Sequence, residues 1–172
     1  MKKIVPGLNV EFREADLPDS GMLGYLYYES WAASMKGVLP DRYLEPYTPE
    51  ALAEAMRRLI GTTYADYFIA YIDGEPSGFG AGDYYQNPDA GEITHLFLLP
   101  QYWGMGYGTM MLDHTMDKLR ERGMTRAGLW VNTTAQRAVR LYERRGFLLT
   151  GESEELFLGG VTQRQVRYER AL

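Results

Sequence analysis

The chain of 172 residues contains no cysteine and only two histidines. Without cysteine it can form neither disulfides nor thiolate metal sites, and a cysteine nucleophile is excluded. With two histidines, a catalytic zinc site would need mostly carboxylate ligands, which is unusual. We therefore expect a protein that uses no metal.

Long apolar runs are also missing. No segment approaches the roughly 18 residues that a membrane helix needs, and the N-terminal stretch MKKIVPGLNVEF has no hydrophobic region after its two lysines. We therefore expect a cytoplasmic protein that does not enter a membrane. Basic residues number 18 against 23 acidic ones, and the net charge of −5 disfavours a broad nucleic-acid surface and weakly suits a cationic small substrate.

Repeats, low-complexity segments and Pro/Gly/Ser linkers are absent as well. The sequence therefore predicts that residues 1–172 form one domain. A chain of this length buries roughly 70% of its unfolded surface, which is enough for a core without covalent cross-links.

The hydrophobic pattern predicts both strands and helices. The expected strands cover 8–15, two runs within 64–85, 91–100, 126–132, 147–158 and 161–170, and the expected helices cover 22–34, 50–61, 104–123 and 135–145. We expect Thr48 to cap the second helix, Thr133 or Thr134 to cap the fourth, and Gly146 to end the fourth. The order βααβββαβαββ indicates an α/β (α+β) fold with a mixed sheet and helices on its faces.

Three glycines at alternate positions, Gly104, Gly106 and Gly108, separate an apolar strand from a helix. No Gly-Lys-Ser/Thr follows, and GxGxG differs from the dinucleotide fingerprint GxGxxG. The glycines either let the helix pack tightly on the sheet or open a helix N-terminus, where free N–H groups favour an anion. Their place directly after a buried strand favours the anion site, because ligands of α/β sheets bind there.

Two motifs of this region resemble a known family. The strand and turn contain Leu96-x-Leu98-x-Pro100 and Trp103-x-x-Gly106-x-Gly108, and the later helix contains Tyr142 before Gly146-Phe147. Residues 92–147 are thereby similar to the acetyl-CoA-binding core of the GNAT superfamily of N-acetyltransferases. Two positions depart from the family pattern. Trp103 stands where arginine or glutamine is more frequent, so one cation near the pyrophosphate is missing. Ala135 stands in place of an asparagine, and Asn132 lies three residues earlier.

The resemblance implies a mostly antiparallel sheet of about seven strands with helices on both faces. The strands 91–100 and 126–132 would splay apart and hold the pantetheine of acetyl-CoA between them. The resemblance assigns the backbone of Leu98 and Leu99 to the pantetheine. It assigns Trp103 and the loop that follows to the rest of the co-substrate, with the loop acting through its amides: Gly104, Met105, Gly106, Tyr107, Gly108 and Thr109.

Acetyl transfer needs a neutral amine, a polarised thioester carbonyl and a proton for the departing thiolate. The resemblance suggests Glu92 as the base, the amide of Leu98 as the group that polarises the carbonyl, and Tyr142 as the acid. Alternation places Glu92 on the face of Leu96 unless a bulge intervenes. His95 would then face the other side, and it remains a rival base, a structural histidine or a substrate contact; water is a further route for the proton.

The first helix and its connector, which line the acceptor cleft in the family, are crowded with aromatic residues. Tyr28 and Trp31 are our candidate substrate contacts, beside the carboxylates of Glu29, Asp41 and Glu45. The expected acceptor is a primary amine of a small molecule or a protein.

The alternative function is that of a non-catalytic acyl-CoA-binding sensor. Family precedent and the free edge of the C-terminal hairpin make a homodimer an option.

Overall fold

A computed structural model describes residues 9–172 except residues 63 and 86, and it leaves the side chain of residue 62 undescribed. Leu8, expected to open the first strand, lies outside the described residues. The sheet has seven strands in the order β1-β2-β3-β4-β5-β7-β6. All neighbours are antiparallel except β4 and β5, which are parallel. The strands are β1 (Val10–Glu14), β2 (Ala65–Ile72), β3 (Glu75–Asp83), β4 (Ala90–Leu98), β5 (Arg126–Asn132), β6 (Leu148–Leu158) and β7 (Val161–Ala171).

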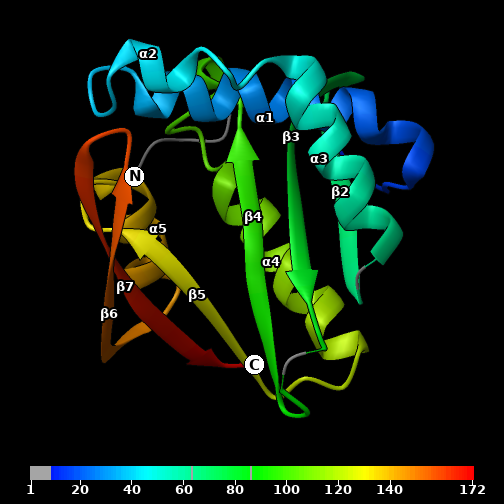
Figure 1. Cartoon of the computed structure of the whole chain (residues 1–172). Helices are drawn as coiled ribbons and strands as arrows, with labels where there is room; N and C mark the ends of the chain where they lie inside the picture. The colour runs from blue at the N-terminus through cyan, green and yellow to red at the C-terminus, as the bar shows by residue number, and fades with distance from the viewer. Residues whose placement is uncertain (1–8, 63, 86) are drawn as a thin grey trace.

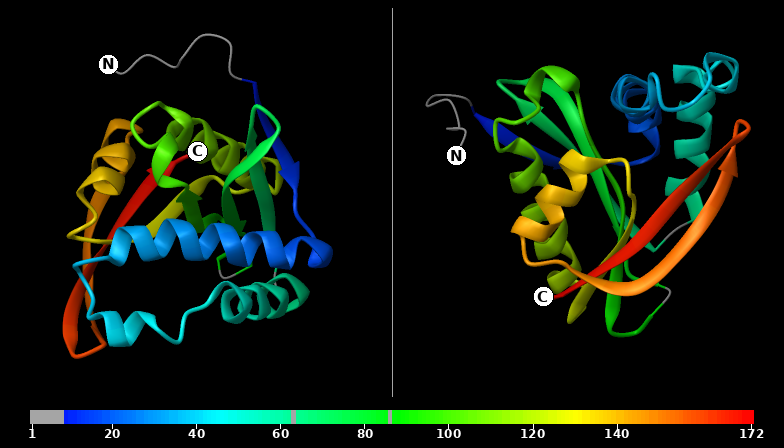
Figure 2. Two further views of the ribbon diagram at one scale, coloured as in Figure 1. Left: turned by 90° about the horizontal axis from the view of Figure 1, so that it is seen from above. Right: turned by 90° about the vertical axis from the view of Figure 1, so that its left-hand side faces the viewer.

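The helices cover both faces of this sheet (Figures 1 and 2). They are α1 (Ser20–Met35), α2 (Asp41–Leu44), α3 (Pro49–Thr62), α4 (Tyr107–Glu121) and α5 (Gln136–Arg144), with short 3-10 turns at η1 (Leu17–Asp19) and η2 (Pro100–Tyr102). Helices α1 and α3 lie on one face, and α4 and α5 lie on the other. The expected fold is confirmed, and α2 is an additional short helix within a connector expected to be irregular.

Local turn chemistry explains several of these boundaries. The Thr48 hydroxyl accepts the amide of Ala51 at 3.2 Å, which confirms Thr48 as a cap of α3. Gly146 has φ of 82°, the left-handed geometry expected after α5. The expected cap at Thr133 or Thr134 is wrong, because the N-cap of α5 is Ala135, which offers no side-chain hydrogen bond.

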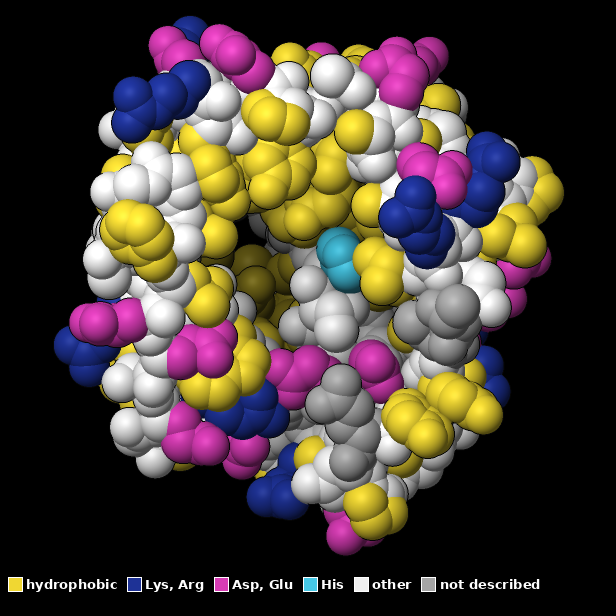
Figure 3. All heavy atoms as spheres, viewed as in Figure 1, with side chains coloured by type: hydrophobic (Ala, Val, Ile, Leu, Met, Phe, Trp, Pro, Cys, Tyr) yellow, Lys and Arg dark blue, Asp and Glu magenta, His cyan; other side chains and the backbone are white. Residues whose placement is uncertain are grey.

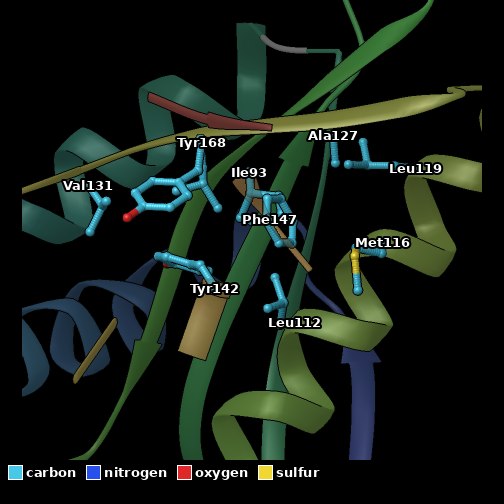
Figure 4. Packing of buried hydrophobic residues seen from close by; sticks show 10 residues of the cluster. Ile93, Leu112, Met116, Leu119, Ala127, Val131, Tyr142, Phe147 and Tyr168 are labelled. Atoms are coloured by element: carbon cyan, nitrogen blue, oxygen red, sulfur yellow. The ribbon is translucent and has the colours of Figure 1, made fainter. Parts of the chain in front are cut away.

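The largest core cluster lies between the sheet and helices α4 and α5. Figure 4 shows side chains from β4, α4 and α5 converging there, with Ile93, Leu112, Tyr142 and Phe147 among them. A second cluster, between the sheet and α1, includes Leu23, Leu26 and Phe79. The two clusters pack against β4 from both faces, and the first also covers one face of β5. These two strands carry the candidate site.

Strands β4 and β5 pair for only three residues each. Ala90 to Glu92 face Arg126 to Gly128, after which β4 continues with β3 and β5 continues with β7. Figure 1 shows the two strands diverging toward the end of β4. The expected splay is therefore present, and it leaves one backbone edge of each strand without a neighbouring strand.

A β-bulge interrupts the pairing of β3 with β4. Ala81 is opposite His95, whereas the next residue, Gly82, is opposite Ile93. Thr94 is thus an extra residue without a partner on β3. A bulge of this kind reverses the alternation of side chains beyond it.

The bulge corrects the faces expected for the candidate bases. Leu96 packs toward Met111 on the α4 face, whereas the ring of His95 lies 5.8 Å from that of Tyr27 on the α1 face. Glu92, on the other side of the bulge, also projects to the α1 face, where it meets Arg167. The expectation that Glu92 shares a face with Leu96 and that His95 faces away is wrong; Glu92 and His95 share a face.

Candidate active site

The loop between β4 and α4 depends on two left-handed glycines. Gly104 has φ of 72° and Gly106 has φ of 96°, a conformation that costs other L-residues roughly 1–2 kcal/mol. Gly108 has no positive φ; a methyl group placed on it would lie 3.5 Å from Leu141 of α5, an ordinary contact. The first two glycines are therefore required by the turn, and the third is not.

The turn presents a series of unused amides. Gly106 is the N-cap of α4 and offers no side-chain cap, and the first capping bond runs from the amide of Met110 to the carbonyl of Gly106 at 3.2 Å. Among the described residues, the amides of residues 104–109 have no hydrogen-bond acceptor. Free N–H groups together with the positive end of the α4 dipole form a site suited to a phosphate group.

The edge of β4 that faces the gap can be assigned from one hydrogen bond. The amide of Leu99 donates to the carbonyl of Ser77 on β3 at 2.8 Å. Backbone groups of an antiparallel strand alternate between its two sides, so the N–H and C=O groups of Leu98 and Leu96 point toward the gap. Leu99 therefore does not fit the backbone role expected of it, whereas Leu98 does, and Leu96 is a further candidate that the sequence argument missed.

Trp103 ties the loop to this strand edge. Its indole Nε1 donates to the carbonyl of Leu98 at 2.7 Å. The Leu98 carbonyl is thereby occupied, while its N–H remains available on the gap side. Trp103 also lies against Arg137 of α5, whose guanidinium carbon is 3.4 Å from the centre of the ring.

Tyr142 lies in the core beside the gap, with 8% of its surface exposed. Its ring packs edge to face against Phe147 at 5.9 Å, and burial raises the pKa of Tyr142 to about 12. The Tyr142 hydroxyl has no hydrogen-bond partner among the described residues, whereas the hydroxyl of Tyr168 donates to Glu143 at 2.9 Å. Tyr142 is therefore a protonated phenol with an unused donor.

Glu92 is held by an arginine that the sequence argument did not identify. Arg167 of β7 donates to both carboxylate oxygens of Glu92, at 3.1 Å and 3.0 Å. It also donates to Glu169 at 3.1 Å. Burial alone lowers the pKa of Arg167, but the bonds to Glu92 and Glu169 raise it overall. Gly128 of β5 leaves room for this pair, because a side chain there would contact the guanidinium of Arg167.

His95 stands among aromatic rings on the same face. Its Nδ1 lies 3.0 Å from the hydroxyl of Thr94, the bulge residue, and its ring is 5.6 Å from Phe79 and 5.9 Å from Tyr67. Burial lowers the pKa of His95 to about 4, so the imidazole is neutral at neutral pH. Figure 3 shows a hollow on this face below α1, with apolar side chains around it and histidine and acidic side chains near it.

The candidate substrate contacts Tyr28 and Trp31 line a pocket of about 350 Å³ together with Tyr47, Asp41 and Glu45. This pocket lies between α1 and the connector that contains α2. A row of ring contacts links it to His95, running from Tyr47 to Trp31 at 4.9 Å, from Trp31 to Tyr27 at 6.4 Å and from Tyr27 to His95 at 5.8 Å. The structure thus connects Trp31 and His95 through Tyr27, which the sequence argument had not singled out.

Asn132, the asparagine three residues before Ala135, makes side-chain hydrogen bonds within the protein. Its amide nitrogen donates to Gln163 at 2.6 Å, and its oxygen accepts the amide and hydroxyl of Thr134 at 3.0 Å and 2.8 Å. These bonds fix the turn before α5. Asn132 therefore has a structural role here.

The described part of the chain offers neither a metal site nor a helix that could span a membrane. No group of three or more histidine, aspartate or glutamate side chains among the described residues could hold a metal ion. No described helix has the length and hydropathy to cross a membrane.

Comparison with known proteins agrees with this geometry. The model of the acetyltransferase (GNAT) family matches residues 29–147. An uncharacterized N-acetyltransferase of Archaeoglobus fulgidus is 30% identical over 141 residues, which cover 77% of this chain and 89% of the relative.

Two solved structures share the fold across 95% of this chain. The PaiA N-acetyltransferase of Thermoplasma acidophilum in complex with coenzyme A has a TM-score of 0.74 and 20% identity, with 99% of that chain covered. The Salmonella typhimurium acetyltransferase that modifies the N-terminal serine of ribosomal protein L7/L12 has a TM-score of 0.73 and 20% identity, with 95% covered. The match to the family model and to the named relative identifies the chain as an acyltransferase. The chain belongs to the GNAT family of acetyltransferases.

Proposed function

We propose that this protein transfers the acetyl group of acetyl-CoA to a primary amine by direct attack within a ternary complex. The observation that carries the proposal is the gap between β4 and β5, which ends at the unused amides of residues 104–109. A strand edge with free backbone groups suits the amide-containing pantetheine arm, and a helix N-terminus suits a diphosphate. Coenzyme A combines these two chemical features in one molecule.

The groups beside the gap fit the roles that the reaction requires. The amide of Leu98 faces the gap and can donate to a thioester oxygen as negative charge develops there, in the manner of an oxyanion hole. Tyr142 has an unused phenol and can protonate the departing thiolate. The thioester supplies an activated acetyl group, so no metal is needed for activation.

The incoming amine must lose a proton, since an alkylammonium has a pKa near ~10.4. We assign this role to Glu92, whose carboxylate is fixed on the α1 face of the sheet by the bidentate contact with Arg167. The proton that Glu92 accepts then passes to solvent. His95 is neutral and is assigned a contact with the amine, because an uncharged imidazole can accept a hydrogen bond without repelling a cation.

The acceptor is expected to carry positive charge. Asp41 and Glu45 stand beside Trp31 and Tyr47 in the pocket between α1 and the connector, and carboxylates next to aromatic faces attract ammonium groups. Lys36 also lines this pocket. The two carboxylates therefore outnumber the one ammonium group, and the pocket attracts a cationic acceptor. A small polyamine or the amino terminus of a protein would satisfy this arrangement.

The test is the release of free thiol when purified protein is mixed with acetyl-CoA and a broad panel of amines. We expect release with at least one amine and a matching acetylated product by mass spectrometry. A parallel calorimetric titration with coenzyme A separates binding from turnover. Binding without turnover on any amine would favour the sensor alternative, and absence of binding would refute the proposed site altogether.

A further inference from the structure

Arg137 lies beside the loop that would receive the diphosphate. It is the second residue of α5, and its guanidinium carbon lies 3.4 Å from the centre of the Trp103 ring. Leu141, one helical turn later, packs toward Gly108 in the first turn of α4. One face of α5 therefore runs along the loop from Trp103 to Gly108, and Arg137 lies at the Trp103 end of it.

The charge of Arg137 is not balanced within the protein. Among the residues that the structure describes, no carboxylate lies within ion-pair distance of its guanidinium, and the charged group that most affects it is Arg140. Burial and the charge of Arg140 lower the pKa of Arg137, although it remains protonated at any physiological pH. Arg137 is exposed, with the ring of Trp103 against its guanidinium, so it is accessible to a ligand. A cation without a carboxylate partner beside another cation favours a bound anion.

The stacked geometry keeps the donors of Arg137 available. The five N–H groups of a guanidinium lie in its plane, so a ring against one face leaves them free at the edge. Trp103 is itself fixed, since its indole donates to the carbonyl of Leu98 at 2.7 Å. The platform, and with it the cation, is therefore held in place before any ligand arrives.

We propose that Arg137, positioned by Trp103, binds the diphosphate of coenzyme A and supplies the cation that the loop itself lacks. The inference rests on the proposed function, because it assumes that coenzyme A occupies the gap. Trp103 thereby has a defined role: it does not contact phosphate through a charge of its own, but holds a cation that comes from the neighbouring helix.

The test measures dissociation constants by calorimetry for coenzyme A, for dephospho-coenzyme A, which lacks the 3′-phosphate, and for pantetheine, which lacks the diphosphate. Arg137→Gln should weaken binding of both nucleotides about tenfold, the value of one hydrogen bond to a charged group. Pantetheine should be unaffected. The control is Arg144→Gln, which removes the same charge from the far end of α5, where its guanidinium donates to the carbonyl of Arg140.

A double-mutant cycle tests the role of the platform. Trp103→Ala should also weaken binding of coenzyme A, and adding Arg137→Gln to it should cause little further loss, because the two residues act as one unit. Additive losses would show that Arg137 does not depend on Trp103. Thermal melts of each variant establish that the protein is folded before binding is compared.

The outcomes separate the two proposals. If the unmodified protein does not bind coenzyme A, the proposed function fails. If it binds and Arg137→Gln binds equally well, only this inference fails, and the stacking is a packing contact. If the loss appears with coenzyme A but disappears with dephospho-coenzyme A, Arg137 contacts the 3′-phosphate and the assignment to the diphosphate is refuted.

Discussion

Substitution of Gly106 by alanine is the most direct test of the loop. Gly106 has φ of 96° and is the N-cap of α4. Alanine disfavours this conformation by roughly 1–2 kcal/mol because its Cβ approaches the neighbouring carbonyl. The backbone can either retain the strained angle or relax it. Relaxation would turn the amides of the first α4 turn away from their common direction.

The two responses have different magnitudes. Retained strain lowers the free energy of unfolding by roughly 1–2 kcal/mol, and each kcal/mol lowers Tm by about 2–4 °C in a protein of this size. Relaxation also removes at least one hydrogen bond to the diphosphate, which weakens binding of coenzyme A about tenfold or more. We therefore expect a loss of stability together with a loss of affinity.

The assays are thermal or urea unfolding and calorimetric titration with coenzyme A. Gly123→Ala is the matched control, because Gly123 follows the other end of α4 with φ of 84° and open space around an added methyl group. It should lose similar stability and keep its affinity. Gly108→Ala, without a positive φ, should lose no stability. If Gly106→Ala bound coenzyme A as tightly as Gly123→Ala does, the assignment of the diphosphate to this turn would be refuted.

Three further predictions concern groups around the gap and the sheet. Tyr142→Phe should lower kcat about 100-fold and leave the affinity for coenzyme A unchanged; an equal loss in both would indicate a packing role. His95 protonates near pH 4 in the folded protein and near 6.5 when unfolded, so the free energy of unfolding should fall as the pH drops from 6.5 to 4, by up to about 3 kcal/mol. His95→Asn should flatten this part of the pH profile, and an unchanged slope would contradict the burial argument. Gly78→Ala should destabilise the protein by about 1–3 kcal/mol in urea melts, because the added methyl group would lie 2.5 Å from the carbonyl of Phe97; wild-type stability would show that β4 can shift there.

Local patterns predicted most of the elements. The alternation within β4 and β5, the cap at Thr48 and the left-handed end of α5 at Gly146 all involve interactions within a few residues along the chain. The glycine loop belongs to the same class, because a positive φ and a helix start are local properties. For this reason the sequence predicts an anion site, and the resemblance to one family predicts that the co-substrate binds there.

The error in the faces of β4 arose where one residue changed a regular pattern. Counting alternate residues along β4 put Glu92 and His95 on opposite faces, but the bulge at Thr94 places them on the same face. Whether a strand forms a bulge depends on the neighbouring strand and on the packing of both faces. The backbone pairing of Leu99 also depends on the neighbouring strand, because its amide donates to the carbonyl of Ser77 on β3.

By itself, the sequence determined the order of strands and helices, the glycine turn and the family. Tertiary structure alone decided the partners of the candidate functional groups: Arg167 reaches Glu92 across 75 positions of sequence, and Arg137 stacks on Trp103 because α5 packs beside the start of α4. The physical reason is range. Backbone conformation responds to neighbours along the chain, whereas an ion pair or a stacked cation exists only after the sheet order and helix packing have brought distant residues together.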